Sequence, residues 1–129
     1  IQNIDVISWF GEINSISSLG ILIPFLIAAT LKTAQGSSTV AIITTASIIT
    51  PMLSVFGLEN ELGKVLAILS IGVGSMTVSH ANDSYFWIVS QMGGLDVKTA
   101  YRTHTLATLL QGLTGIILLL AIYNIAQVL

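Results

Sequence analysis

Four long stretches without a charged residue constrain this chain more than any other feature of its sequence. They cover 13–31, 33–58, 65–82 and 103–129. About 18 consecutive, mainly apolar residues are enough for a helix to span the hydrocarbon core of a bilayer. Charged residues make up about 25% of an ordinary soluble domain, whereas they make up 8% of these 129 residues. We therefore expect an all-α polytopic membrane protein.

The composition also excludes several classes of protein. Four basic residues against six acidic ones leave no basic surface for a nucleic-acid backbone. The absence of cysteine excludes a disulfide framework, a Cys-based zinc site and a thiol nucleophile. Serine, histidine and aspartate are present, but without a Gly-x-Ser-x-Gly elbow or a recognisable metal-ligand spacing. We expect no nucleic-acid partner, no metal, no cofactor and no enzymatic activity.

The first residues indicate how the chain enters the membrane. Ile1–Asp5 contain neither an initiator methionine nor the basic start of a signal peptide, so we expect a part of a longer protein. Residues 4–16 have apolar side chains at helical spacing, including Trp9 and Phe10. Aromatic rings collect at the headgroup level of a bilayer. The pattern predicts an amphipathic connector at the membrane surface.

Residues 17–57 consist of two apolar limbs separated by a polar segment. Pro24 lies in the first limb and Pro51 in the second, and the polar segment is Lys32–Thr39. Two arrangements fit this pattern. Both limbs can cross the bilayer completely, or they can form a re-entrant hairpin whose polar tip stops at mid-membrane. The second requires protein or water around the tip, because lipid cannot satisfy non-helical backbone.

Residues 65–92 are apolar except for Ser79–Ser84, a polar run near the middle of the segment. An aspartate at the centre of a spanning helix costs about 3 kcal/mol, so this run must face protein or water. We predict a broken transmembrane helix with halves at 65–78 and 84–92. A polar loop is expected at 93–104, followed by a final transmembrane helix at 105–129.

The two polar interruptions are the candidate sites of chemistry. Helices beginning near Ser38 and Ser84 would direct free N–H groups and positive dipole ends toward them, as anion-binding transporters do. Lys32 either adds positive charge there or extends to the surface. Asp83 beside His80 suits a proton relay, although both side chains can also simply cap helix ends and bond one another. The side chains that can hydrogen-bond a small polar ligand are Gln35, Ser37, Ser38, Thr39, Asn82 and Ser84.

These two segments resemble a known family. Lys32–Ala41 and Gly74–Trp87 closely resemble the C-terminal part of the gluconate permease family of proton symporters, and the resemblance extends over about 14–129. It implies a re-entrant helical hairpin at 17–57, then the broken helix at 65–92 and the last span. These elements resemble the second inverted repeat of the ion-transporter superfamily. The remainder of the transporter chain would supply the first repeat, so we expect no transport by these residues alone.

The resemblance also implies a function. It implies proton-coupled uptake of gluconate or a related sugar acid across the bacterial inner membrane, by a multi-pass protein that can form a homodimer. The small anionic sugar acid would dock between Gly36–Thr39 and His80–Ser84, and Asp83, assisted by His80, would carry the proton. The residues alone do not distinguish Na⁺ from H⁺ as the coupling ion. The alternatives are another hydroxylated acid such as D-serine, a non-transporting membrane anchor, and an intramembrane hydrolase.

Overall fold

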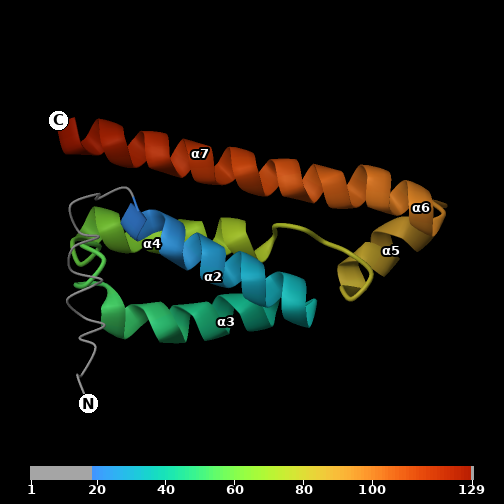
Figure 1. Ribbon diagram of the computed structural model, residues 1–129, viewed down its shortest axis with the longest axis horizontal. Helices are drawn as coiled ribbons and strands as arrows, with labels where there is room; N and C mark the ends of the chain where they lie inside the picture. The colour runs from blue at the N-terminus through green and yellow to red at the C-terminus, as the bar shows by residue number, and fades with distance from the viewer. Residues whose placement is uncertain (1–18, 129) are drawn as a thin grey trace, which may run out of the picture.

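The computed structural model describes residues 19–128, and all regular structure in this range is helical (Figure 1). This confirms the expectation of an all-α chain, while the connector predicted at 4–16 lies outside the described residues. The elements are α2 (Leu19–Gln35), α3 (Ser38–Ile49), the 3₁₀ turn η1 (Thr50–Met52), α4 (Glu61–Ser75), α5 (Ser84–Met92), α6 (Val97–Ala100), the π-helical turn η2 (Tyr101–Thr105) and α7 (Leu106–Val128).

Helices α2 and α3 form an antiparallel hairpin. Gly36 makes the turn with a φ of 70°, a left-handed conformation that glycine adopts without steric cost. Ser37 then caps α3, because its Oγ accepts a hydrogen bond from Val40 N. The chain therefore reverses within two residues, and α3 runs back along α2 (Figure 1).

A non-helical segment at 76–83 lies between α4 and α5, the two helices in the region predicted as a broken helix. Helix α4 begins earlier than the predicted 65 because Asn60 caps it by accepting from Gly63 N at 2.6 Å. It also ends earlier, at Ser75, so the break is wider than the polar run. Within the break, Val78 has a φ of 54°, an unusual and strained conformation for a β-branched residue. Helix α5 begins at Ser84, where the second half was expected.

The core lies where α2 and α4 pack together between α3 and α7 (Figure 1). Ser70 on α4 donates a hydrogen bond to the carbonyl of Ile21 on α2 at 2.6 Å. Gly112 of α7 lies directly against the Thr77 side chain, so α7 approaches the break closely. The largest apolar side chains of the core cluster are Ile21, Phe25, Ile49, Phe56, Leu58, Leu66, Ile116, Leu119 and Tyr123.

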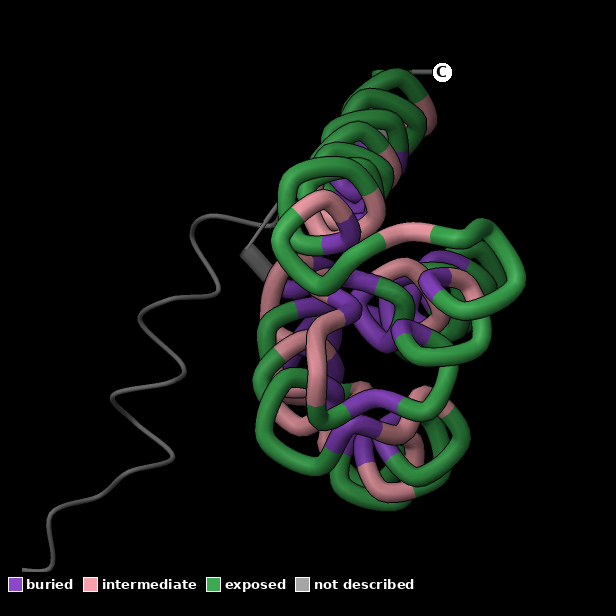
Figure 2. Tube along the Cα trace, turned by 90° about the vertical axis from the view of Figure 1, so that its right-hand side faces the viewer, coloured by how far each residue is buried: buried purple, intermediate pink, exposed green. Residues whose placement is uncertain are grey.

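The outward faces of the helices remain apolar and exposed. Figure 2 shows buried residues on the facing sides of the helices and exposed residues along most of α7. Ile68, Ile117 and Ile125 are among the large apolar side chains that are exposed. One helix in the described range, Val97–Ala126, is long and apolar enough to cross a bilayer. Such surfaces are typical of contacts with lipid or with further helices rather than with water.

The prediction of a polar loop at 93–104 is wrong from Val97 onward, because a helix begins at that residue. Asp96 caps this helix by accepting from Thr99 N at 2.7 Å. The same hydrogen bond lowers the pKa of Asp96. Polarity was the basis for expecting a loop, but a helix can start inside a polar segment wherever a capping side chain is present. The helix then passes through the π-helical turn η2 before α7.

Candidate functional site

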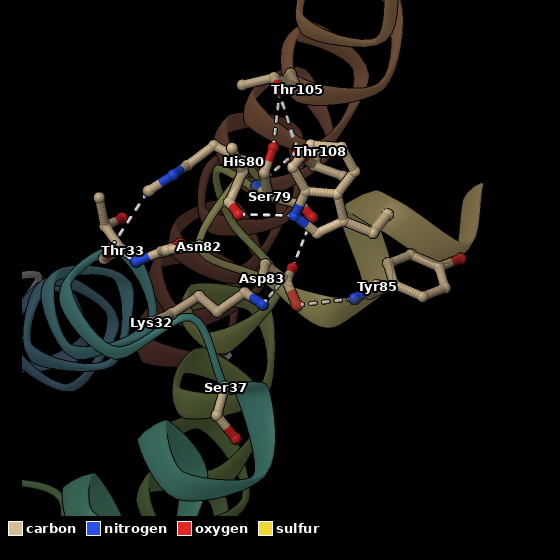
Figure 3. A network of polar contacts seen from close by, with 12 residues as sticks. Lys32, Thr33, Ser37, Ser79, His80, Asn82, Asp83, Tyr85, Thr105 and Thr108 are labelled. Atoms are coloured by element: carbon tan, nitrogen blue, oxygen red, sulfur yellow. Dashed lines mark hydrogen bonds and ion pairs between the residues drawn. The ribbon is translucent and has the colours of Figure 1, made fainter. Parts of the chain in front are cut away.

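The tip of the hairpin lies against the break between α4 and α5. Asn82 Nδ2 donates to the carbonyl oxygens of Thr33 and Ala34 at 2.8 and 3.3 Å (Figure 3). His80 Nε2 lies 3.1 Å from the carbonyl oxygen of Thr33. The last carbonyls of a helix have no partner within it, so these side chains satisfy the end of α2. Gly36 completes the contact, because a Cβ atom there would overlap the backbone carbonyl of Asn82.

A buried ion pair lies beside this contact. Lys32 Nζ is 2.5 Å from Asp83 Oδ2, and the two side chains are 2% and 6% exposed. Ser79 Oγ donates to the same carboxylate oxygen at 2.5 Å. The other oxygen, Oδ1, accepts from Tyr85 N at 3.0 Å and thereby caps α5. The structure thus directs Lys32 inward rather than to the surface, and the carboxylate has a cation, a hydroxyl and a backbone N–H as partners.

The non-helical backbone of the break is held by side chains from the last helix. Thr105 Oγ1 donates to Ser79 O at 2.7 Å, and Thr108 Oγ1 accepts from Ser79 N at 3.0 Å (Figure 3). The hydroxyl of Tyr101 accepts from Ala81 N at 3.3 Å. Unpaired backbone groups are costly away from water, so these contacts make an irregular segment possible here. Sequence reasoning missed them, although polar residues at 105, 108 and 111 share one side of an apolar helix.

We expect Thr108→Val to destabilise the protein by about 1–3 kcal/mol, because it leaves the buried N–H of Ser79 without its acceptor. Thr108→Ser keeps the hydroxyl and should cost less. The measurement is the thermal unfolding midpoint, in detergent, of a full-length permease that carries this segment. Thr103→Val is the control, since exposed Thr103 Oγ1 only bonds the carbonyl of Thr99 on its own helix. Equal midpoints for the two valine variants would show that the hydrogen bond between Thr108 and Ser79 does not stabilise the protein.

A cavity of about 200 Å³ opens beside the ion pair. His104 Nε2, from η2, is buried and has no hydrogen-bond partner among the described residues. The ring of Tyr85 meets that of His104 edge-on, with centroids 5.4 Å apart. Apart from these two rings and the ion pair, the polar residues of the lining carry three hydroxyl groups and one amide. The polar lining comprises Lys32, Ser38, Ser79, Asp83, Tyr85, His104, Thr108 and Gln111.

The residues singled out in the sequence have different places here. Ser38, at the start of α3, and Asp83 line the cavity. Ser37, Asn82 and His80 instead bind backbone: Ser37 caps α3, and the other two hold the tip. The side chains of His80 and Asp83 have separate partners and do not bond one another. Three further candidates are exposed and do not line the cavity, namely Gln35, Thr39 and Ser84.

The outer faces of the helices are apolar, and the cavity between two helix interruptions is lined by charged and hydroxyl groups. This arrangement is typical of membrane permeases. The similarity of the chain to known proteins agrees with this class. The chain matches the GntP family permease over residues 6–126, and it belongs to this family. The gluconate permease family indicated by the sequence is therefore confirmed, and these proteins are transporters rather than enzymes.

Several curated relatives are similar to the chain. It is 36% identical to a gluconate permease of Pseudomonas aeruginosa over 78% of the chain and 22% of that protein. It is 40% identical to the inner membrane permease YgbN of Escherichia coli, over 73% of the chain and 20% of YgbN. It is 36% identical to the Gnt-II system L-idonate transporter of Escherichia coli, over 79% of the chain and 22% of that transporter. The chain spans about a fifth of the length of these relatives. No solved structure matches it.

Proposed function

We propose that this chain is part of the membrane domain of a bacterial inner-membrane permease that takes up gluconate or a related sugar acid together with protons. The family and the names of its relatives support the substrate class and the membrane. The single observation that carries the proposal is the buried Lys32–Asp83 pair beside a cavity lined by hydroxyl groups. A cation suits the carboxylate of a sugar acid, and the hydroxyls suit its polyol chain.

Helix lengths support the re-entrant arrangement over two complete crossings. Helix α3 has 12 residues, whereas about 20 are needed to cross the hydrocarbon core. A limb of 12 residues is about 18 Å long, because each helical residue adds 1.5 Å. The tip would therefore stop inside the membrane, where it contacts the break at 76–83. In this proposal α4 and α5 cross together as one broken helix, and α7 provides the final crossing.

The ion pair argues against a membrane anchor that transports nothing. Replacing a buried ion pair by apolar residues of similar size is often neutral or stabilising. A segment that only holds a protein in the membrane has no physical need of Lys32 and Asp83 at mid-depth. A transported acid provides that need, because its charge must be balanced inside the protein. The same pair would also fit a zwitterion such as D-serine, with Lys32 facing the carboxylate and Asp83 the ammonium group.

The proposal is tested by an uptake assay with a full-length permease that carries this segment, reconstituted in vesicles. The panel contains gluconate, other sugar acids and D-serine, and the pH and Na⁺ gradients are imposed separately. We expect accumulation of a sugar acid that follows the pH gradient and is unaffected by Na⁺. Accumulation of D-serine alone would favour the zwitterion, and uptake driven by Na⁺ would contradict proton coupling. A protein that transports none of these compounds would refute the proposed function.

The homodimer is a separate expectation, which native mass spectrometry of the same preparation can test.

A further inference from the structure

Lys32 and Asp83 neutralise each other completely in the structure. Lys32 Nζ has Asp83 Oδ2 as its hydrogen-bond partner at 2.5 Å among the described residues. Among the described residues that line the cavity, Asp83 is the one with a carboxylate. The other titratable groups that line the cavity are Tyr85 from α5 and His104 from η2, while His80 is held by the carbonyl of Thr33. A substrate anion that enters the cavity therefore meets a lysine that is already paired.

We propose that the substrate carboxylate replaces Asp83 at Lys32, and that Asp83 is released from the lysine as the protonated acid. This inference rests on the proposed function. One proton and one anion enter from water, the Lys32–Asp83 ion pair breaks, and a Lys32–substrate ion pair forms. Lys32 keeps its charge throughout. The added proton forms the O–H bond of Asp83, and no bond of the substrate is made or broken.

The charge balance explains why proton and anion must bind together. The empty site holds one positive and one negative charge, and the loaded site holds lysine, the substrate anion and a neutral acid. Both states are neutral. If the anion entered while Asp83 remained ionised, the buried site would carry an excess negative charge. If Asp83 were protonated with no anion present, Lys32 would be left buried and unpaired. Both half-loaded states are disfavoured, because an uncompensated buried charge is costly.

The partners of Asp83 fit both states of the exchange. Ser79 Oγ donates to Oδ2 of the carboxylate in the structure. A hydroxyl can also accept a hydrogen bond, so Ser79 can accept from the protonated acid after Lys32 has changed partners. Oδ1 keeps its bond from Tyr85 N in both states and continues to cap α5. The acid therefore has hydrogen-bond partners before and after protonation, without rearrangement of the break.

The test measures binding of gluconate to a purified full-length permease that carries this segment, by titration calorimetry over a range of pH. Between the pKa of Asp83 in the empty site and its pKa in the loaded site, the Kd should rise about tenfold for each unit of pH, because one proton binds with each anion. Buffers of different ionisation enthalpy should report about one proton taken up per anion. With Asp83→Asn, gluconate should still bind, with a Kd independent of pH and no proton uptake at pH values where Lys32 stays charged. With Lys32→Gln, the Kd should rise about 100-fold.

Matched variants separate charge exchange from misfolding. Lys64→Gln should leave the Kd unchanged, since Lys64 pairs with Glu61 at 2.9 Å on the exposed surface. If Lys32→Gln alone does not fold, the double variant Lys32→Gln/Asp83→Asn removes both charges together and should fold without binding gluconate. An unchanged Kd in the single or the double variant would overturn the inference. So would a wild-type Kd that is independent of pH while uptake persists, and that result leaves the proposed function intact. A wild-type protein that neither binds nor transports any sugar acid would instead refute the proposed function itself.

Discussion

Replacement of Asp83 by asparagine is expected to abolish accumulation of substrate against its gradient and to reduce the inside-to-outside ratio to about 1. Asparagine has nearly the same shape as aspartate and is an equally good helix N-cap, so α5 should still form. It cannot take up a proton at physiological pH. Exchange of labelled for unlabelled substrate should continue, because Lys32 still binds the anion. The pH gradient then has no group through which to drive uptake.

The measurement is the accumulation ratio in vesicles with an imposed pH gradient, together with the exchange rate in its absence. Asp96→Asn provides a matched control. Asp96 also caps a helix, α6, through a hydrogen bond from a backbone N–H, but it is exposed and does not line the cavity. That variant should accumulate substrate as the wild type does. Undiminished accumulation by Asp83→Asn would show that another group carries the proton.

Gly36→Ala should reduce the uptake rate about 100-fold, the effect that a displacement of about 1 Å can have on a functional geometry. Two features of Gly36 contribute. Its φ of 70° disfavours any residue with a Cβ atom. In addition, the Cβ atom would overlap the backbone carbonyl of Asn82. The overlap can be relieved only if the tip moves away from the break, which would displace Lys32 from Asp83.

Gly57→Ala separates these two contributions. Gly57 has a φ of 66°, nearly that of Gly36, but no atom lies within 4 Å of the position that its Cβ would occupy. Both variants therefore carry a similar backbone strain, and only Gly36→Ala also pushes the tip from the break. Initial uptake rates are compared after normalisation to the amount of each protein in the membrane. Similar rates for the two variants would show that close contact between tip and break is unnecessary for transport.

Local chemistry explains which features of the fold were predictable from sequence. A run of polar residues around an aspartate inside an apolar segment must face protein or water and favours an interruption, and the structure has non-helical backbone from 76 to 83. Gly36 between apolar limbs indicates a turn, and α3 follows it directly. The helix that begins at Val97 was missed, because hydropathy describes burial whereas the cap at Asp96 decides where helix starts.

The site was less predictable, because its contacts join residues far apart in the chain. The residues of the Lys32–Asp83 pair are 51 positions apart, and nothing in the local pattern of either residue identifies the other. Asn82 was expected to read substrate hydroxyls, yet its amide is bound to Thr33 and Ala34. Backbone carbonyls compete for side-chain donors wherever a helix ends, and a sequence does not show which helix ends will meet. Thr105 and Thr108 were missed for the same reason.

The hydrogen bonds from Asn82 and His80 to the carbonyls of α2 connect the tip of the hairpin to the segment between α4 and α5. A net hydrogen bond contributes about 1 kcal/mol, so these three hydrogen bonds by themselves contribute only a few kcal/mol to holding the tip against the break. Lys32 lies in the last turn of the same helix. Movement of the tip away from the break would therefore also separate Lys32 from Asp83. In the proposed transporter, movement of the tip and release of Lys32 from its carboxylate partner would therefore occur together.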